Sequence, residues 1–324
     1  MRTLKNQRVL VTGANGGLGL ATCIAALKEG AHVVLACRSA DKAASAQARA
    51  VAAAGVPTAR ALAAGGFDML DPSAIDRAVA ALPNEPLDVV FLQAGGWVVA
   101  DEAQHVVLGG RRVERTLAQN VVGAHATLRA LMASGRLAPH GRVVIVGGEG
   151  ARGVPRAIRK PTFADLAHFE RALAGVPGPY VPIDALGVAK LCAALWAQHL
   201  ARHTDDLEVV WFTPGLIGGT RGTAGLPALQ EFIVQRIAFP LFVALGRAQW
   251  PATAAAKCVD CLAGRVGRHG DLLGAPEGAA LGPLTDQKPM NPHFTDPRMQ
   301  RAVWDLCEAA AGALPLALAE RHRA

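Results

Sequence analysis

Four closely spaced glycines near the N-terminus belong to the stretch Thr12-Gly13-Ala14-Asn15-Gly16-Gly17-Leu18-Gly19. The stretch follows the apolar run Val9-Leu10-Val11 and precedes a helical pattern that reaches Gly30. A strand, a glycine turn and the start of a helix therefore come in the order that a dinucleotide phosphate site requires. Glycines let the backbone approach a pyrophosphate closely, and the N–H groups at the start of the helix favour its negative charge. The sequence thus predicts that residues 13–19 bind the phosphates of a dinucleotide, with a purely structural glycine turn as the alternative.

The end of the second expected strand, 32–36, bears on the choice of cofactor. A site selective for NAD would carry an acidic residue there to hold the ribose hydroxyls. Cys37 occupies that place, Arg38 follows it, and Ser39 and Lys42 are close by. A cation with hydroxyl neighbours suits a 2′-phosphate, so we predict NADP (NADPH) as the cofactor and consider NAD less favoured. An arginine stacked on the adenine would fit either cofactor.

The elements that must position these residues are read from apolar periodicity and from glycine and proline breaks. Continuous apolar runs, as in residues 87–92, are typical of parallel strands that are covered on both faces. Strands and helices alternate, which predicts one α/β domain over residues 1–324 with a doubly wound parallel sheet of the Rossmann type. The expected strands are 8–12, 32–36, one within 60–69, 87–92, 142–146 and 208–212, and the expected helices are 17–29, 40–54, 72–82, 112–134, 183–203, 251–263 and 296–314.

Composition bounds the class of protein. The chain has 324 residues, of which 51% are hydrophobic and 18% charged, so it is expected to be globular rather than disordered. Its net charge is +7, but the basic residues are mostly scattered and aromatics are only 5%, which argues against nucleic-acid binding. No apolar run is long enough for a transmembrane helix, and no export signal precedes the first strand, so we expect a cytoplasmic protein.

The six cysteines show no paired framework and are expected to be reduced and mostly buried. Cys258 and Cys261 form a single C-x-x-C pair with nothing to supply two further ligands. We therefore expect them to pack in the core and predict no metal site.

Taken together, these motifs resemble those of the short-chain dehydrogenase/reductase family over nearly the whole chain. Within that family the chain is most similar to the branch of retinol dehydrogenases and light-dependent protochlorophyllide reductases. The matching residues are the stretch 12–19, Ala36-Cys37-Arg38, Asp68, Ala94-Gly95, Asn120, Lys190-Leu191-Cys192 and Pro214-Gly215.

The resemblance implies roles for several of these residues. It implies that Gly13, Asn15, Gly16, Gly17, Leu18 and Gly19 form the phosphate site. It also implies that Asp68 and Met69 contact the adenine, that Ala94 and Gly95 lie along the cofactor, and that Lys190 bonds the nicotinamide ribose. Residues after Pro214-Gly215 would hold the carboxamide, where Thr220 stands one place later than the threonine usual in the family.

The family's chemistry uses a serine, a tyrosine and a lysine, often with an asparagine that here would be Asn120. The tyrosine donates a proton to the carbonyl oxygen as hydride arrives, while the lysine and the ribose lower the pKa of the tyrosine. Lys190 is present, but Leu186 stands four residues before it, where the tyrosine is expected. Gly148 replaces the serine, so the chain is an atypical member in which two of three central groups are missing.

Two side chains could stand in for the missing acid. Tyr180 is the only tyrosine and is expected in the loop before the helix that carries Lys190. Glu149 adjoins the position of the missing serine and could act if burial raised its pKa. We name Lys190, Asn120 and Tyr180 as the catalytic candidates and leave Glu149 as an alternative; Asp184 is expected to point elsewhere on its helix.

Residues 221–250, whose centre 232–245 is strongly apolar, are predicted to form a substrate lid. Such a lid suggests a large apolar, polycyclic or isoprenoid substrate; core packing, a homodimer interface and a peripheral membrane contact are the alternatives. The predicted function is an NADPH-dependent oxidoreductase that transfers hydride to a hydrophobic carbonyl or conjugated substrate with an unconventional proton source. The alternatives are a catalytically silent NADP-binding sensor or scaffold, and a non-redox isomerase, lyase or cyclase.

Overall fold

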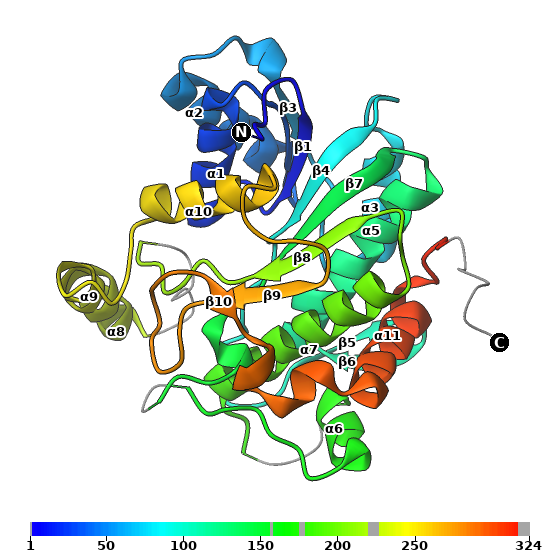
Figure 1. The fold of residues 1–324 in the computed structure, drawn as a ribbon, viewed down its shortest axis with the longest axis vertical. Coiled ribbons are helices and arrows are strands. Elements are labelled where there is room, and N and C mark those ends of the chain that lie inside the picture. The colour runs from blue at the N-terminus through cyan, green and yellow to red at the C-terminus, as the bar shows by residue number, and fades with distance from the viewer. Residues whose placement is uncertain (1, 156–157, 175–178, 220–226, 317–324) are drawn as a thin grey trace.

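A computed structural model describes residues 2–155, 158–174, 179–219 and 227–316 of the protein (Figure 1). Its centre is an eight-stranded sheet in the order β10-β9-β8-β7-β4-β1-β2-β3, in which only the pair β9 and β10 is antiparallel. This confirms the predicted α/β fold with a mostly parallel, doubly wound sheet. The strands are β1 (Arg8–Thr12), β2 (His32–Ala36), β3 (Ala61–Ala64), β4 (Leu87–Leu92), β7 (Leu137–Val146), β8 (Glu208–Phe212), β9 (Asp271–Gly274) and β10 (Thr285–Asp286).

Helices cover both faces of the sheet and create two apolar cores (Figure 1). One face is covered by α1 (Gly17–Lys28), α2 (Ala40–Ala54) and α10 (Pro251–Leu262). The other face is covered by α3 (Pro72–Ala80), α5 (Gly123–Ala133), α7 (Pro182–Arg202) and α11 (Pro297–Ala311). Because both faces are dry, the central strands are nearly continuous runs of Val, Leu, Ile and Phe.

Shorter elements complete the fold. They are the strands β5 (His105–Leu108) and β6 (Arg111–Glu114), the helices α4 (Arg115–Leu117), α6 (Leu166–Leu173), α8 (Ala228–Ile233) and α9 (Phe239–Ala244), the π-helical η2 (Ala118–Val122) and η5 (Val234–Ala238), and the 3₁₀ turns η1 (Thr58–Arg60), η3 (Glu149–Ala151), η6 (Lys288–Met290) and η7 (Pro292–Thr295). Among the residues described, no helix is long and apolar enough to span a bilayer.

The predicted start of the helix over 112–134 was wrong. Residues 111–114 belong instead to β6, which pairs with β5 in an antiparallel hairpin. Gly109 and Gly110 form the hairpin turn with φ of 54° and 75°, and two successive positive φ values are typical of a tight hairpin turn. The helix therefore starts only at Arg115, and Asn120 lies in the π-helical turn η2.

The predicted boundaries also needed correction near the C-terminus. The helix predicted to reach residue 314 ends at Ala311, because Gly312 adopts φ of 86° and leaves the helical path before Pro315. Strands β9 and β10 were not predicted, and they extend the sheet beyond β8.

The helix α11 packs over α7 and α5 through an aromatic cluster. Trp196 of α7 donates a hydrogen bond to His125 Nδ1 of α5 at 3.2 Å, and His125 Nε2 lies 2.8 Å from the carbonyl oxygen of Gly312. Trp304 of α11 stacks on Trp196 and on His199. One nitrogen of His125 accepts and the other donates, so this environment holds the neutral imidazole.

This cluster predicts acid sensitivity. Burial lowers the pKa of His125 to about 4 and that of His199 to about 3, whereas an unfolded histidine titrates near its ordinary value of 6.5. The unfolded state therefore binds more protons as the pH falls through this window, and stability is lost there. We expect the free energy of unfolding to fall by about 2 kcal/mol per histidine between pH 7 and about pH 5, measured by urea denaturation.

His125→Gln should reduce this loss of stability on acidification, even though the substitution lowers stability at neutral pH. His168→Gln is the matched control because His168 is exposed on the surface helix α6. An unchanged pH dependence in His125→Gln would contradict the assignment of the effect to His125.

Candidate functional site

A cavity of about 580 Å³ lies at the carboxyl ends of β1, β4, β7 and β8. Ligands of open α/β sheets bind at this edge, outside the carboxyl ends of the strands. The cavity brings together thirteen residues named from the sequence: Gly13, Asn15, Gly16, Gly17, Leu18, Arg38, Asp68, Met69, Ala94, Gly95, Lys190, Pro214 and Gly215. Gly19, Ser39, Asn120 and Tyr180 are not among its described lining residues, and Thr220 lies outside the described part of the chain.

The glycine turn has the geometry that a pyrophosphate needs. Gly13 adopts φ of 66°, and a Cβ added at Gly19 would lie 2.5 Å from the Gly13 carbonyl oxygen, so the helix packs directly on the turn. Helix α1 begins here with no side chain capping its first N–H groups and no acidic residue in its first turn. Uncapped N–H groups that face a cavity are what an anionic group requires, so these residues fit the phosphates of a dinucleotide.

Gln93 ties the glycine turn to the end of β4. Its side-chain Nε2 donates to the carbonyl oxygens of Thr12 at 2.7 Å and Gly13 at 2.9 Å. The hydroxyl of Thr12 accepts in return from the backbone N–H groups of Gln93 and Ala94, both at 3.0 Å. Gln93 thus joins the ends of β1 and β4 through hydrogen bonds in both directions.

The residues after β2 differ in how they face the cavity. Cys37 is fully buried in the core, so its side chain is not available to ribose hydroxyls. Arg38 is exposed and lines the cavity together with Lys42. Ser39 is the N-terminal cap residue of α2, and its side chain makes no capping bond. Two cations therefore border this part of the cavity, and Asp68 lines it from the end of the neighbouring strand β3.

Asn120 contacts the loop 94–96, which forms part of the cavity wall, without lining the cavity itself. Its Nδ2 donates to the carbonyl oxygens of Gly96 at 2.5 Å and Thr116 at 2.7 Å. Its Oδ1 is buried without a hydrogen-bond partner, directly against the place where a Cβ on Gly95 would sit. Asn120 therefore positions the loop 94–96 instead of lining the cavity, and the π-helical turn η2 lets it do so.

Tyr180 lies in the loop before α7, as predicted, but its hydroxyl is held by neighbours outside the described lining. The hydroxyl oxygen lies 3.2 Å from Glu114 Oε1 and 3.4 Å from the Val98 carbonyl oxygen, either of which can accept its one proton, and 3.4 Å from Thr116 Oγ1. Burial raises the pKa of Tyr180, and the negative charge of Glu114 raises it further. This environment makes the phenol a poor proton donor.

The wall between β7 and α7 carries Lys190 and Glu149. The Lys190 ammonium group lies 3.5 Å from the Val146 carbonyl oxygen, and a Cβ on Gly148 would meet the lysine stem at 3.2 Å. Burial lowers the pKa of Lys190 to about 8, and the charge of Glu149 partly offsets that effect. Leu186 lines the same wall and adds no polar group.

Glu149 lies in η3 and is 8% exposed. The Thr213 hydroxyl donates to its Oε2 at 2.6 Å, whereas its Oε1 is buried and has no hydrogen-bond partner. Burial raises the pKa of this carboxyl group. Sequence reasoning kept Glu149 only as an alternative, because its adjacency to Gly148 was the one available signal.

Two polar residues that line the cavity were not predicted from the sequence. Arg115 and Gln119 line the cavity beside Trp97, and Arg115 also donates to Gln104 Oε1 at 2.9 Å. Residue 115 is the first residue of α4, which the incorrect helix start at 112 concealed. A hairpin assigned from the Gly109-Gly110 pair would have placed the start of the helix near Arg115.

The segment predicted as a lid contains α8, η5 and α9, which lie at the left edge of Figure 1. Bulky apolar side chains on these helices are exposed, among them Leu229 at 72% and Phe232 at 59%. No residue between 227 and 250 is among the described lining residues. Phe239 packs toward the loop after β8, against Gly218.

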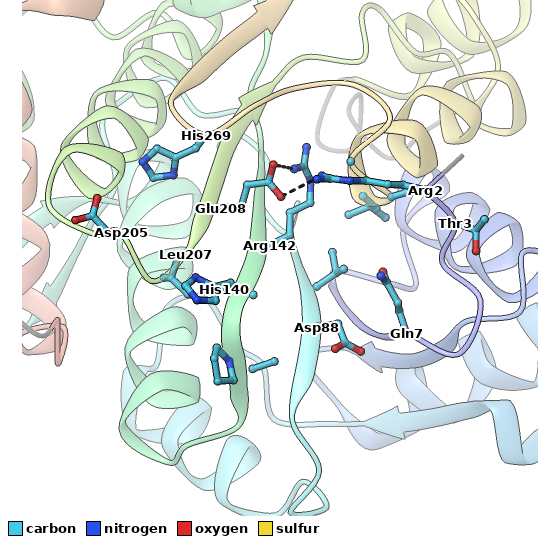
Figure 2. A pocket seen from close by; sticks show the side chains of 17 residues that line it. Arg2, Thr3, Gln7, Asp88, His140, Arg142, Asp205, Leu207, Glu208 and His269 are labelled. Atoms are coloured by element: carbon cyan, nitrogen blue, oxygen red, sulfur yellow. Dashed lines mark ion pairs between the residues drawn. The ribbon is translucent and has the colours of Figure 1, made fainter.

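A larger cavity of about 810 Å³ lies at the opposite edge of the sheet (Figure 2). Its most buried cation, Arg142, pairs with Glu208 at 2.6 Å and donates to the carbonyl oxygens of Cys261, Val266 and Gly267. Arg2 approaches the same Glu208 carboxylate at 3.8 Å. These charges satisfy one another and join α10 to the sheet, so we read this cavity as structural. Among the described residues, no cluster of three or more His, Cys, Asp or Glu side chains could hold a metal ion.

Comparison with known proteins agrees with this geometry. Residues 7–157 match the family model described as short chain dehydrogenase. The chain is 28% identical over 262 residues to protochlorophyllide reductase B, chloroplastic, of Hordeum vulgare, and the match covers 74% of this chain and 62% of that protein. It is 31% identical over 218 residues to a probable oxidoreductase of Streptomyces antibioticus, covering 66% of this chain and 65% of that protein.

The chain therefore spans somewhat less than two thirds of the length of these two relatives. Among solved structures, an uncharacterised protein of Mycobacterium paratuberculosis superposes with a TM-score of 0.65 at 21% identity, covering 98% of this chain and 97% of that one. At that identity the likeness concerns the fold alone.

Proposed function

We propose that the chain is a member of the short-chain dehydrogenase/reductase family, whose model matches residues 7–157, and that it is an NADP-dependent oxidoreductase. Its substrate in this proposal is a hydrophobic carbonyl or conjugated compound. The observation that carries the proposal is the cavity that joins the uncapped start of α1, the cations Arg38 and Lys42, and the half-buried Lys190.

Each part of the bound cofactor has residues of matching chemistry. When bound, the reduced nicotinamide supplies a hydride, that is, two electrons and one proton. The N–H groups after Gly13 would hold the pyrophosphate, and Arg38, with Ser39 and Lys42, would hold the 2′-phosphate. Asp68 and Met69 would contact the adenine, Ala94 and Gly95 would flank the cofactor, Lys190 would bond the ribose, and Pro214, Gly215 and Thr220 would hold the carboxamide.

The substrate side of the proposal rests on apolar surface. We infer that residues 1–324 work as one unit and that 221–250 form the lid over the substrate, with exposed residues such as Leu229, Phe232 and Ile237 available to cover it. An apolar lid excludes water from the reacting centre and favours large apolar substrates over small polar ones. In the proposal, Asn120 acts by positioning the wall of the cavity.

A second candidate is a silent NADP-binding protein with a sensing role. Leu186 favours it, because a leucine that lines the cavity one helical turn before Lys190 cannot donate a proton. A protein of this kind would bind NADPH without oxidising it in the presence of any ketone.

Calorimetric titration of the protein with NADPH and with NADH tests the proposal. Arg38→Ala should weaken NADPH binding by roughly 10- to 100-fold, since a charge-assisted bond to phosphate contributes about 1.5–3 kcal/mol. It should change NADH binding by less than about threefold, because NADH has no 2′-phosphate. The matched control is Arg49→Ala, an exposed arginine on α2 that does not line the cavity. Failure of the unmodified protein to bind either nucleotide would overturn both candidate functions.

A further inference from the structure

We propose that Glu149 is the proton donor of the reduction and that Lys190 stabilises and reprotonates it. The inference rests on the proposed reductase function and replaces the missing tyrosine and serine with a carboxylic acid. It begins from the one carboxyl group that the structure places on the Lys190 side of the cavity.

The described lining of the cavity contains two carboxyl groups, and they lie on different sides. Asp68 follows β3, at the far edge of the sheet, and its Oδ1 accepts from the backbone N–H of Leu70 at 3.1 Å. Glu149 follows β7 and shares its wall with Lys190, Gly148 and Leu186. The predicted cofactor contacts put adenine beside Asp68 and the nicotinamide ribose beside Lys190. Glu149 is thus the acid on the reactive side.

The two carboxyl oxygens of Glu149 differ in their hydrogen bonding. Oε2 accepts the Thr213 hydroxyl proton at 2.6 Å, which fixes the orientation of the carboxyl group. Oε1 is buried without a partner, and a buried polar oxygen without a partner is costly unless something satisfies it. A proton on Oε1 would turn this atom into a donor. Because Oε1 is itself buried, the proposal requires a rotation of the Glu149 side chain toward the cavity, where a substrate carbonyl oxygen would accept the bond.

Glu149 is surrounded by positively charged side chains, which stabilise its carboxylate after it has donated a proton. Arg152, Lys190 and Lys257 act on it electrostatically, and the charge of Glu149 in turn raises the pKa of Lys190 and of Lys257. Arg152 is itself occupied, because its Nη2 donates to the Ala279 carbonyl oxygen at 2.6 Å. Burial alone favours the neutral acid before the reaction, and the neighbouring Lys190 ammonium favours the carboxylate that forms after it.

In the proposed step, the carbonyl carbon of the substrate would receive a hydride from the reduced nicotinamide of NADPH, which would lose two electrons and become NADP⁺. The carbonyl oxygen would form a new O–H bond with the proton of Glu149. The O–H bond of the Glu149 carboxyl group breaks, and a carboxylate remains beside the Lys190 ammonium. Lys190 then passes a proton to the carboxylate and regains one from solvent. The net reaction is a ketone, a hydride and a proton giving an alcohol.

Neighbouring residues make room for this arrangement. A side chain at Gly148 would press on the stem of Lys190, as the 3.2 Å approach of an added Cβ to Lys190 Cγ indicates. Glycine at this position therefore leaves room for the Lys190 side chain along the cavity wall. Leu186 faces the cavity without competing for the proton.

The first test needs no substrate. Infrared spectra should contain the carbonyl stretching band of a protonated carboxyl group at pH values above the ordinary glutamate pKa of 4.5, and this band should be absent in Glu149→Gln. Thr213→Val removes the hydrogen bond that favours the carboxylate, so it should move the titration of this band to higher pH. Absence of such a band in the unmodified protein would overturn the proposal.

The second test measures turnover with a panel of apolar aryl and cyclic ketones as probes. Glu149→Gln should lower kcat by at least about 100-fold, in line with the loss of a general acid, while NADPH binding by calorimetry changes by less than about threefold. The matched control is Asp184→Asn on α7, which removes a carboxylate outside the described lining. The double variant Leu186→Tyr/Glu149→Gln should regain activity, because it restores a phenol one helical turn before Lys190.

The outcomes separate this proposal from the proposed function. If Glu149→Gln binds NADPH and reduces ketones at the unmodified rate, Glu149 is not the donor and the reductase function stands. If the unmodified protein fails to bind NADPH, the proposed function fails first. If Glu149→Gln does not fold, as judged by circular dichroism, Thr213→Val tests the proposal instead. A shift of the carboxyl band to higher pH in this variant supports Glu149 as the donor, and an unchanged titration contradicts it.

Discussion

Gly19→Ala is expected to abolish NADPH binding, with a loss of at least about 100-fold. An added Cβ would lie 2.5 Å from the Gly13 carbonyl oxygen and 3.1 Å from the Ala14 Cα, which are both backbone atoms. Backbone atoms cannot yield as a flexible side chain does, so helix α1 must move away from the glycine turn. The uncapped N–H groups at the start of α1 would then no longer converge on one anion.

Calorimetric titration with NADPH measures this effect, and Gly55→Ala is the matched control. Gly55 is the C-terminal cap residue of α2 and has φ of 68°, but a Cβ there would meet nothing within 4 Å. Gly55→Ala should therefore cost about 1 kcal/mol of stability through its backbone and leave NADPH binding unchanged. Gly19→Ala binding NADPH within about threefold of the unmodified protein would contradict the assignment of the phosphate site.

The second large effect is expected from Gly147→Ala, which should destabilise the protein by about 3 kcal/mol. Gly147 follows the last residue of β7, and its N–H donates to the Phe212 carbonyl oxygen at 2.8 Å. A Cβ at this position would overlap the indole ring of Trp211, which is 1% exposed on the neighbouring strand β8. The ring is enclosed by the core, so neither partner can move without opening a void elsewhere.

Chemical denaturation measures the loss, and a double-mutant cycle identifies its cause. Trp211→Leu should be destabilising by itself because it leaves a cavity, but it should remove most of the additional cost of Gly147→Ala. Additive losses in the double variant would show that the indole is not what excludes a side chain at position 147. Gly147→Ala should also displace the neighbouring residues Gly148 and Glu149, so turnover should fall together with stability.

Much of the fold follows from local patterns in the chain. The strands β1, β2, β4 and β8 begin and end at the predicted residues, because each is a short apolar run buried on both faces by helices. The hairpin β5–β6 and the strands β9 and β10 were missed, since they have two to four residues each and mix polar with apolar side chains. Periodicity carries little information over so few residues.

The candidate site could likewise be predicted only in part. The glycine turn and Arg38 could be named from the sequence because their function depends on neighbours within one strand, turn and helix. The environment of Glu149 could not be predicted, since it is built by Thr213 from the end of β8 and Lys190 from α7, which are distant in sequence. The position of Tyr180 likewise depends on Glu114, whose strand β6 was assigned to a helix.

The packing of α11 onto α5 and α7 has a consequence for the order of events during folding. The contact between His125 and the Gly312 carbonyl oxygen closes a loop of 187 residues, and Trp304 completes the same apolar cluster. On a ribosome, the face of α5 and α7 would stay uncovered until residue 312 has left the exit tunnel, long after the glycine turn has formed. Contacts of such long range slow folding and leave apolar surface open to aggregation. We therefore expect the nascent chain to be most dependent on chaperones between the emergence of α7 and that of α11.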